Sequence, residues 1–285
     1  MAENEILLLH LGGLGDVCLS ESVFLSLRNH FGDNIVAVGT KRFFRLFPAE
    51  YFLRIHGVES RHWLYLFSKE PMDIRWKRVI FIGKDRQGDL RRRWQEISLD
   101  PVIFIDMYPD KAVSYQQSAF GTPNDENEKV HVEEYQLAQL AQFAIEAVKK
   151  EIPRQRSPRA ILYPERGFEK EKWEPEHFMT LYRSLRSKGI QAHMMVPAGL
   201  QTDVEEAVRI DDLNDVWSFF KGGGIFVSND SGMAHLAGVS GLFTITIFTD
   251  YDPRVWHPRG SNISLQRGVD LFGCNTIEKI ILDNL

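Results

Sequence analysis

The sequence predicts an α/β protein made of two doubly wound parallel sheets, each forming a Rossmann-like domain. Its 285 residues are about twice the usual length of one domain, and 44% apolar residues supply a sizeable core. Short apolar runs without polar alternation recur between longer amphipathic segments, as is typical of parallel strands buried by crossover helices on both faces. A charged, proline-containing stretch lies near the middle of the chain and predicts a boundary there.

The expected strands follow one another along both halves of the chain. They are Ile6–Leu11, Ile35–Val38, Val79–Ile82, Val102–Ile105, Ala160–Tyr163, Ala192–Val196, Ile225–Val227 and Phe243–Phe248. Val17–His30 and His131–Val148 have the pattern of helices. Lys149–Arg159 lacks apolar periodicity, so we expect domains at 1–152 and 153–285. Two such domains facing a cleft would bind ligands beyond the carboxyl ends of their strands.

Composition excludes several classes of protein. The formal net charge of −5 argues against broad binding to nucleic acid. Cys18 and Cys274 form no CxxC pair, so neither a disulfide framework nor a zinc cluster is expected. The first five residues are acidic rather than basic, the apolar run after them ends at Leu11, and no stretch approaches the ~18 apolar residues of a membrane span. These features predict a cytoplasmic protein.

The first candidate site is the turn after the first strand, Gly12-Gly13-Leu14-Gly15-Asp16. Glycines such as Gly13 and Gly15 allow positive φ and a close approach by a phosphate or an acceptor. A nicotinamide fingerprint is the rival interpretation, but Cys18 occupies the place of its third glycine and no acidic residue ends the second strand. Asp16 has two interpretations that can coexist: an N-cap, or a general base kept ionised by the helix dipole.

The second candidate site is the turn from Asn229 into a predicted helix. The N–H groups of Ser231, Gly232 and Met233 would be free to bind a diphosphate. His235 lies one turn further along the same helix face, either at the site or as a core histidine bonded to backbone. A Ser-His hydrolase is a poor alternative, because the sequence lacks the G-x-S-x-G nucleophile elbow.

Five segments in sequence order resemble the heptosyltransferases of glycosyltransferase family nine, and the resemblance covers nearly the whole chain. They are Gly15-Asp16, His131–Tyr135, Lys170–Phe178, Asp230–Ala237 and Phe248–Pro253. Asp230–Ala237 matches the family's D-[ST]-G-x-x-H-L-x-x-A pattern, with the final alanine replaced by Val239. The resemblance implies a GT-B fold and an inverting transferase that moves a sugar, heptose from ADP-heptose, to a saccharide acceptor like the lipopolysaccharide core. It implies no cofactor beyond the nucleotide-sugar donor and no obligatory metal.

The resemblance also implies residue roles. Asp16 would take the acceptor proton, and Lys172 would stabilise the leaving phosphate together with the amides of Ser231 and Gly232. Asp230 would turn to sugar hydroxyls or cap its own helix. The implied substrate-binding residues are Gly13, Gly15, Asp230, Ser231, Gly232, His235, Thr249 and Asp252.

The chain departs from the family pattern in several places. Glu165 follows Pro164 where a glycine is usual, Glu171 fills the usual lysine position, and Ala198-Gly199 replaces a Gly-Gly pair. Thr249 also stands where a glycine is usual, and the chain is short for the family, which predicts a trimmed acceptor domain. Two alternatives follow: a transferase that uses another nucleotide-sugar, or a nucleotide-sugar-binding protein without catalysis. An epimerase of the same fold is disfavoured by the Asp230–His235 motif.

Two basic segments of the first half have double interpretations. Lys41–Phe47 mixes basic and aromatic residues, which suits either a lipid-linked acceptor and the inner face of a membrane or an amphipathic helix whose Phe43, Leu46 and Phe47 join the core. Arg91-Arg92-Arg93 suits a phosphorylated saccharide or a solvated charged face.

Overall fold

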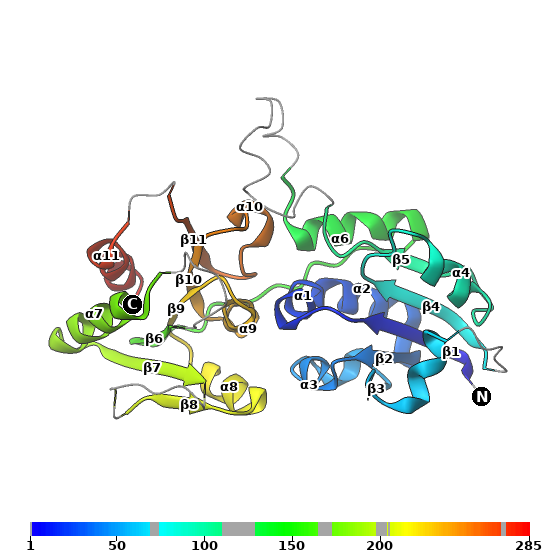
Figure 1. The fold of residues 1–285 in the computed structure, drawn as a ribbon, viewed down its shortest axis with the longest axis horizontal. Helices are drawn as coiled ribbons and strands as arrows, with labels where there is room; N and C mark the ends of the chain where they lie inside the picture. The colour runs from blue at the N-terminus through cyan, green and yellow to red at the C-terminus, as the bar shows by residue number, and fades with distance from the viewer. Residues whose placement is uncertain are drawn as a thin grey trace. The chain divides into compact units, whose positions relative to one another are not determined.

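The structure is a computed structural model that describes residues 2–68, 74–109, 129–164, 173–197, 204, 206–268 and 272–285. The chain divides into two compact units (Figure 1). The first comprises Met1–Asp110 and Val132–Lys150, and the second comprises Lys111–His131 and Glu151–Leu285. The chain therefore changes unit three times, at 110/111, 131/132 and 150/151.

The first unit contains a parallel sheet of five strands in the order β3-β2-β1-β4-β5 among its described residues. The strands are β1 (Ala2–His10), β2 (Ile35–Gly39), β3 (Arg54–Gly57), β4 (Trp76–Ile82) and β5 (Ile103–Ile105). The order reverses between β1 and β4, which makes a topological switch point at their carboxyl ends.

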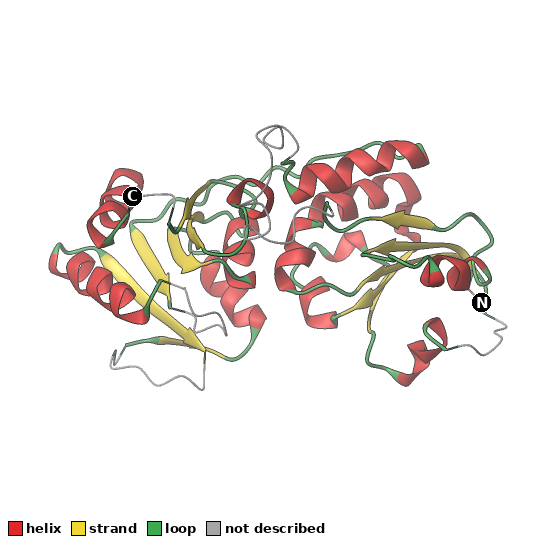
Figure 2. Ribbon diagram, turned by 45° about the horizontal axis from the view of Figure 1, so that its top comes forward, coloured by secondary structure: helices red, strands yellow, loops and turns green. Residues whose placement is uncertain are grey.

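Helices cover both faces of this sheet (Figure 2). They are α1 (Leu14–Leu19), α2 (Glu21–Phe31), η1 (Gly32–Asn34), α3 (Lys41–Phe44), η2 (Ala49–Tyr51), η3 (Arg61–Leu66), α4 (Asp89–Gln95), α6 (Val132–Leu140) and η6 (Ala141–Phe143). Successive residues of a strand point to opposite faces, so Leu7 and Leu9 join a core that includes Trp63 of η3 and Trp94 of α4. His10 points to the other face, where its ring lies against Phe24 of α2.

The second unit contains a parallel sheet in the order β11-β10-β9-β6-β7-β8, the strand order typical of a dinucleotide-binding Rossmann domain. Its strands are β6 (Arg159–Tyr163), β7 (Gln191–Pro197), β8 (Val208–Ile210), β9 (Ile225–Asn229), β10 (Phe243–Phe248) and β11 (Asn262–Gln266). Its helices are α7 (Pro175–Ser187), α8 (Leu213–Phe220), α9 (Gly232–Val239), α10 (Pro253–Trp256) and α11 (Cys274–Asn284). The switch point here lies between β6 and β9.

Two predicted helices differ from the structure. The helix expected at Val17–His30 is divided at Ser20, whose hydroxyl donates to the carbonyl oxygen of Asp16 at 2.9 Å. The helix expected at His131–Val148 ends by Phe143, because Ala144 takes a left-handed conformation with φ 55°. Beyond it, the main-chain N–H groups of Val148 and Lys150 donate to the hydroxyls of Ser26 and Ser22 on α2.

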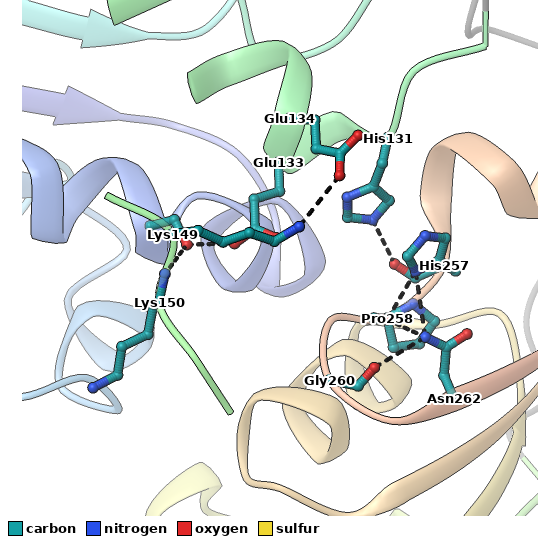
Figure 3. Close-up of polar contacts among 10 residues, drawn as sticks. His131, Glu133, Glu134, Lys149, Lys150, His257, Pro258, Gly260 and Asn262 are labelled. Carbon is teal, nitrogen blue, oxygen red and sulfur yellow. Dashed lines mark hydrogen bonds and ion pairs between the residues drawn. The ribbon is translucent and has the colours of Figure 1, made fainter. Parts of the chain in front are cut away.

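The returning segment is also held on the first unit by charge. The Nζ atom of Lys149 lies 3.2 Å from Oε1 of Glu134 and 3.9 Å from Oε2 of the buried Glu133 (Figure 3). Glu133 in turn accepts a hydrogen bond from the hydroxyl of Ser22. Helix α6, through Glu133, and the segment that follows it, through Val148 and Lys150, are thus both bonded to serines of α2. Among the described residues, no helix combines the length and the hydropathy that crossing a bilayer requires.

Candidate active-site segments of the two units

The carboxyl end of β1 carries the first segment. After His10, three residues lead into α1, and Asp16 is the third residue of that helix. Its Oδ2 accepts a hydrogen bond from the main-chain N–H of Gly13, at 2.8 Å. Gly13 is the N-cap residue, so the expectation that Asp16 itself is the N-cap is wrong. Within the described part of the chain, Oδ1 of Asp16 has no hydrogen-bond partner.

Burial raises the pKa of Asp16 above its ordinary value, and the bond from Gly13 opposes this shift only in part. At the start of the short helix α1, the Gly13 N–H favours the ionised carboxylate, while desolvation is the larger influence on its pKa. A carboxylate with a raised pKa and one unoccupied oxygen is suited to accept a proton from a hydroxyl group.

The glycines of this turn matter for the room that their missing side chains leave, not for a positive φ. Gly13 has φ −69°, and neither Gly12 nor Gly15 is among the described glycines with positive φ, which corrects the conformational expectation. A Cβ atom on Gly12 would lie 2.6 Å from Cβ of Asp16 and 2.8 Å from Cε1 of His10. Gly12 is needed because Asp16 and His10 approach its backbone so closely.

His10 is a residue that the sequence analysis did not single out. Its side chain is fully buried; Nδ1 accepts from the N–H of Gly12 at 3.2 Å, and Nε2 lies 3.1 Å from Oγ of Ser20. The Ser20 hydroxyl donates to Asp16, so it accepts from Nε2, and both ends of the ring require the same neutral tautomer. Burial lowers the pKa of His10 to about 4, which keeps the ring neutral near pH 7.

The second segment lies at the carboxyl end of β9, where α9 begins. Ser231 is its N-cap, with its hydroxyl accepting from the N–H of Ala234 at 3.4 Å, so the alternative in which Asp230 caps this helix is wrong. No acceptor among the described residues meets the N–H groups of Ser231, Gly232 and Met233. The start of α9 thus presents three main-chain donors at the switch point of the sheet, as an anion-binding turn requires.

His235 lies one turn into α9 and is 5% exposed. Its Nε2 is 3.8 Å from Oδ1 of Asp230, while its Nδ1 is buried without a hydrogen-bond partner in the described structure. The alternative of a histidine satisfied by backbone is therefore wrong. Burial, assisted by His131 and His257, lowers the pKa of His235 to about 3.

His131 and His257 form a stacked pair in the same unit, with ring centroids 3.9 Å apart. Nε2 of His131 donates to the carbonyl oxygen of His257 at 2.9 Å (Figure 3). Nδ1 of His257 donates to the carbonyl oxygen of Pro258, which Asn262 also contacts. The motif histidine at 131 therefore holds the chain against α10 just before it enters the first unit.

Thr249 and Asp252 follow β10, the strand next to β9. Oδ2 of Asp252 lies 2.7 Å from Nζ of Lys129 and 2.9 Å from Nη2 of Arg254, and Oδ1 accepts from the N–H of Arg254. These contacts, led by Arg254, lower the pKa of Asp252 to about 2 despite its burial. Thr249 contacts Asp250 through its hydroxyl and Gln266 through its carbonyl oxygen.

Several sequence predictions fall outside the described residues. They are Lys172 with its neighbours Lys170 and Glu171, Glu165 after Pro164, and Ala198-Gly199. The described residue that follows Lys172 is Trp173, whose main-chain N–H donates to Oδ1 of Asn229 at 2.9 Å, while Nδ2 of Asn229 donates back at 3.1 Å. Asn229 directly precedes Asp230, so Trp173 is fixed beside the start of the α9 turn.

The two basic segments of the first unit are largely explained by packing. Phe44, Leu46 and Phe47 are buried, and Phe24 contacts both Phe44 and Phe47, whereas α3 is only four residues long. Phe43, expected in the core, is only partly buried.

On α4, Arg91 lies over the ring of Phe104, Arg92 pairs with Asp89, and Arg93 pairs with Glu96. Among the described residues, no group of three or more His, Cys, Asp or Glu side chains could hold a metal ion.

Two Rossmann-like units with a carboxylate at one switch point and free amides at the other define a GT-B type of enzyme architecture. The model of glycosyltransferase family 9 (heptosyltransferase) matches residues 110–271, more than half of the chain. The chain belongs to this family and is a glycosyltransferase. Asp16 lies outside the matched range, so its role rests on its own geometry.

Solved structures of low identity share the fold. Escherichia coli heptosyltransferase WaaC with ADP has a TM-score of 0.70 at 15% identity, covering 99% of this chain and 100% of that chain. WaaC with ADP-2-deoxy-2-fluoro heptose has a TM-score of 0.67 at 15% identity, with 99% and 100% covered. E. coli ADP-heptose lps heptosyltransferase II has a TM-score of 0.59 at 15% identity, with 98% of each chain covered. No curated protein sequence matches the chain.

Proposed function

We propose that the protein is an inverting glycosyltransferase that moves heptose from ADP-heptose to a saccharide acceptor resembling the lipopolysaccharide core. The observation that carries the proposal is the free amide turn of Ser231, Gly232 and Met233 at a Rossmann switch point, in a member of this family. The ADP and the ADP-sugar analogue bound by WaaC support an ADP-linked donor.

In this mechanism Oδ1 of Asp16 takes the proton of the acceptor hydroxyl as its oxygen attacks the anomeric carbon of the donor. The bond from that carbon to the diphosphate oxygen breaks, and attack from the opposite side inverts the configuration. The departing ADP carries the electron pair, and the amides at the start of α9 stabilise its negative charge. Asp230 would contact hydroxyls of the sugar; the support is its position at the start of α9, with its carboxylate 3.8 Å from Nε2 of His235.

Lys172 is the proposed side-chain partner of the leaving phosphate. The support is the pair of hydrogen bonds that fixes the adjacent Trp173 to Asn229, one residue before Asp230. Amides and a lysine would supply the positive charge that a bridging cation supplies elsewhere, so we propose that the reaction needs neither metal nor cofactor. Gly13 and Gly15 would leave room for the acceptor, and Thr249 and Asp252 would border the donor. The enzyme would work in the cytoplasm, with peripheral contact to the inner face of the membrane where a glycolipid acceptor is made.

The test combines donor binding with transfer. Thermal stability is measured with ADP-, UDP- and GDP-sugars, because a ligand of the native state stabilises it in proportion to its affinity. Transfer from ADP-heptose is then compared between the native protein and Asp16→Asn, which is expected to bind the donor normally and to transfer roughly 10²–10⁴-fold more slowly. Stabilisation only by another nucleotide-sugar, or full activity of folded Asp16→Asn, overturns the proposal. Donor binding without transfer in the native protein identifies a binding protein instead.

A further inference from the structure

We propose that His10 is a positioning residue that sets the geometry of Asp16 by holding the turn between β1 and α1; the proposal rests on the role of Asp16 given above. The imidazole is completely buried at the end of β1 and touches no solvent from which it could act on substrate. Its two nitrogens instead reach Gly12, in the turn before α1, and Ser20, the residue that ends α1.

The first link runs through the main chain. Nδ1 accepts the N–H of Gly12 at 3.2 Å and so fixes the orientation of the Leu11–Gly12 peptide, one peptide before the one that carries the Gly13 N–H. The next N–H along the chain, that of Gly13, donates to Oδ2 of Asp16 at 2.8 Å. With Oδ2 occupied in this way, Oδ1 is the oxygen left to receive a proton.

The second link runs through Ser20. Nε2 of His10 donates to Oγ of Ser20 at 3.1 Å, and that hydroxyl donates to the carbonyl oxygen of Asp16 at 2.9 Å. The ring is therefore linked to the Asp16 segment by two routes, through Ser20 to the main-chain carbonyl of Asp16 and through Gly12 to the residue before the capping Gly13. The clearance at Gly12, where any Cβ would meet both His10 and Asp16, shows how closely the three groups are packed.

The consequence concerns the proton affinity of Asp16. The Gly13 N–H favours the ionised carboxylate and opposes the effect of burial. If the turn is loosened by loss of the Gly12–His10 bond, the Gly13 bond weakens, and the pKa of Asp16 moves further up. The Asp16 carboxylate is then also less firmly oriented, and a small displacement of a catalytic group lowers the rate considerably.

The test compares three replacements of His10. His10→Phe keeps a ring against Phe24 and Phe44 and removes both hydrogen bonds; His10→Asn restores an acceptor near the place of Nδ1; His10→Gln restores only a donor near the place of Nε2. The Asp16 carboxyl carbon is titrated by NMR and assigned by its loss in Asp16→Asn, while kcat and donor KM are measured in parallel.

We expect His10→Phe and His10→Gln to raise the Asp16 pKa by about one unit and to lower kcat about 10- to 100-fold with donor KM unchanged. His10→Asn should recover most of both quantities. An unchanged Asp16 pKa in folded His10→Phe, or equal loss in all three variants, overturns the proposal. If His10→Phe does not fold, Ser20→Ala tests the second link with the same two readouts.

The two proposals fail separately. The Asp16 titration does not depend on any transferase activity, so it can support the positioning role even when no donor is turned over. Full transfer by Asp16→Asn would instead overturn the proposed function and leave the titration result standing.

Discussion

The Oδ2 atom of Asp16 lies 2.8 Å from the main-chain nitrogen of Gly13, so the third residue of α1 bonds to the residue that caps the same helix. Two opposing influences meet at this carboxyl group. Burial favours the neutral acid and the Gly13 N–H favours the carboxylate, and the pKa of Asp16 lies above its ordinary value because burial is the larger influence. The group is therefore a better proton acceptor than an exposed aspartate.

The first prediction is an acid limb in the transfer rate. If Asp16 must be ionised, kcat falls tenfold per pH unit below its pKa, and the limb begins above the 3.8 that is ordinary for aspartate. The measurement is kcat between about pH 4 and about pH 8 with saturating donor. A rate that stays flat down to the ordinary aspartate value would contradict a base at Asp16.

Asp16→Asn is also expected to increase stability. Because the folded-state pKa is above the unfolded value, the native state binds the proton more tightly, and ionisation at neutral pH costs stability that returns as pH falls through the folded pKa. Asparagine removes this cost and can still accept from Gly13. Urea unfolding at neutral pH should show the variant at least as stable as the native protein, a pattern found where a group is kept for function. Lower stability would assign Asp16 to the fold instead.

A third prediction separates the two adjacent glycines. Gly12→Ala places a Cβ 2.6 Å from Cβ of Asp16, so the turn must shift and kcat should fall about 10- to 100-fold. Gly13→Ala is the comparison at saturating acceptor, because its Cβ lies at an ordinary 3.6 Å from Oδ2 of Asp16 and its φ of −69° suits alanine. Any loss of acceptor room at Gly13 should then raise the acceptor KM rather than lower kcat. Equal rates for the two alanine variants, both folded, would show that the close approach at Gly12 does not matter for transfer.

A fourth prediction concerns the stability of the second unit in acid. The native pKa of His235, about 3, lies well below the ordinary 6.5, so the native state resists a proton that the unfolded chain accepts. Its stability contribution is complete above about pH 6.5 and falls with decreasing pH toward 3, by at most about 1.4 kcal/mol per unit. Urea unfolding of the native protein and of His235→Leu over this range measures it. Parallel pH profiles for the two would show that His235 does not cause the loss.

The sequence was sufficient for the interior strands of both sheets and for one edge strand, β5, whose three residues are all buried, but not for the other edges. The central strands, such as β1 and β10, are buried on both faces and so read as apolar runs. The edge strands β3, β8 and β11 were not predicted, because a strand with one neighbour and partial exposure has no need of an uninterrupted apolar run. Helix ends were missed at Ser20, whose hydroxyl bonds back to the carbonyl oxygen of Asp16 and also contacts His10, and after Phe143, where Ala144 takes a positive φ.

At the candidate site, too, the sequence revealed the features that depend on local sequence and missed one that depends on the folded structure. The turns at Asp16 and Ser231 were visible because glycine and capping residues follow apolar strands in the local sequence. His10 was not, because its role depends on a tautomer fixed by Gly12 and Ser20, and only folding brings Ser20 to it. The sequence did contain a signal for His10. Side chains alternate between the two faces of a strand, so His10 is a polar residue on the same buried face of β1 as Leu8.

The last prediction isolates a single main-chain donor of the α9 turn. Gly232 is the first residue of the helix, where proline is tolerated because its missing N–H makes no helical bond. Ser231 before it is extended, with φ −165° and ψ 162°, which suits a residue preceding proline. Gly232→Pro therefore deletes one N–H while the Ser231 cap to Ala234 can remain.

Gly232→Ala is the control, since it adds a side chain and keeps the N–H. If this amide holds the diphosphate, losing a hydrogen bond to a charged group should weaken ADP binding about 10- to 100-fold in Gly232→Pro relative to Gly232→Ala. Calorimetric titration with ADP gives both affinities, and thermal unfolding confirms that the two variants are equally folded. Equal affinities would remove the start of α9 from the donor site, and with it the observation on which the proposed donor chemistry depends.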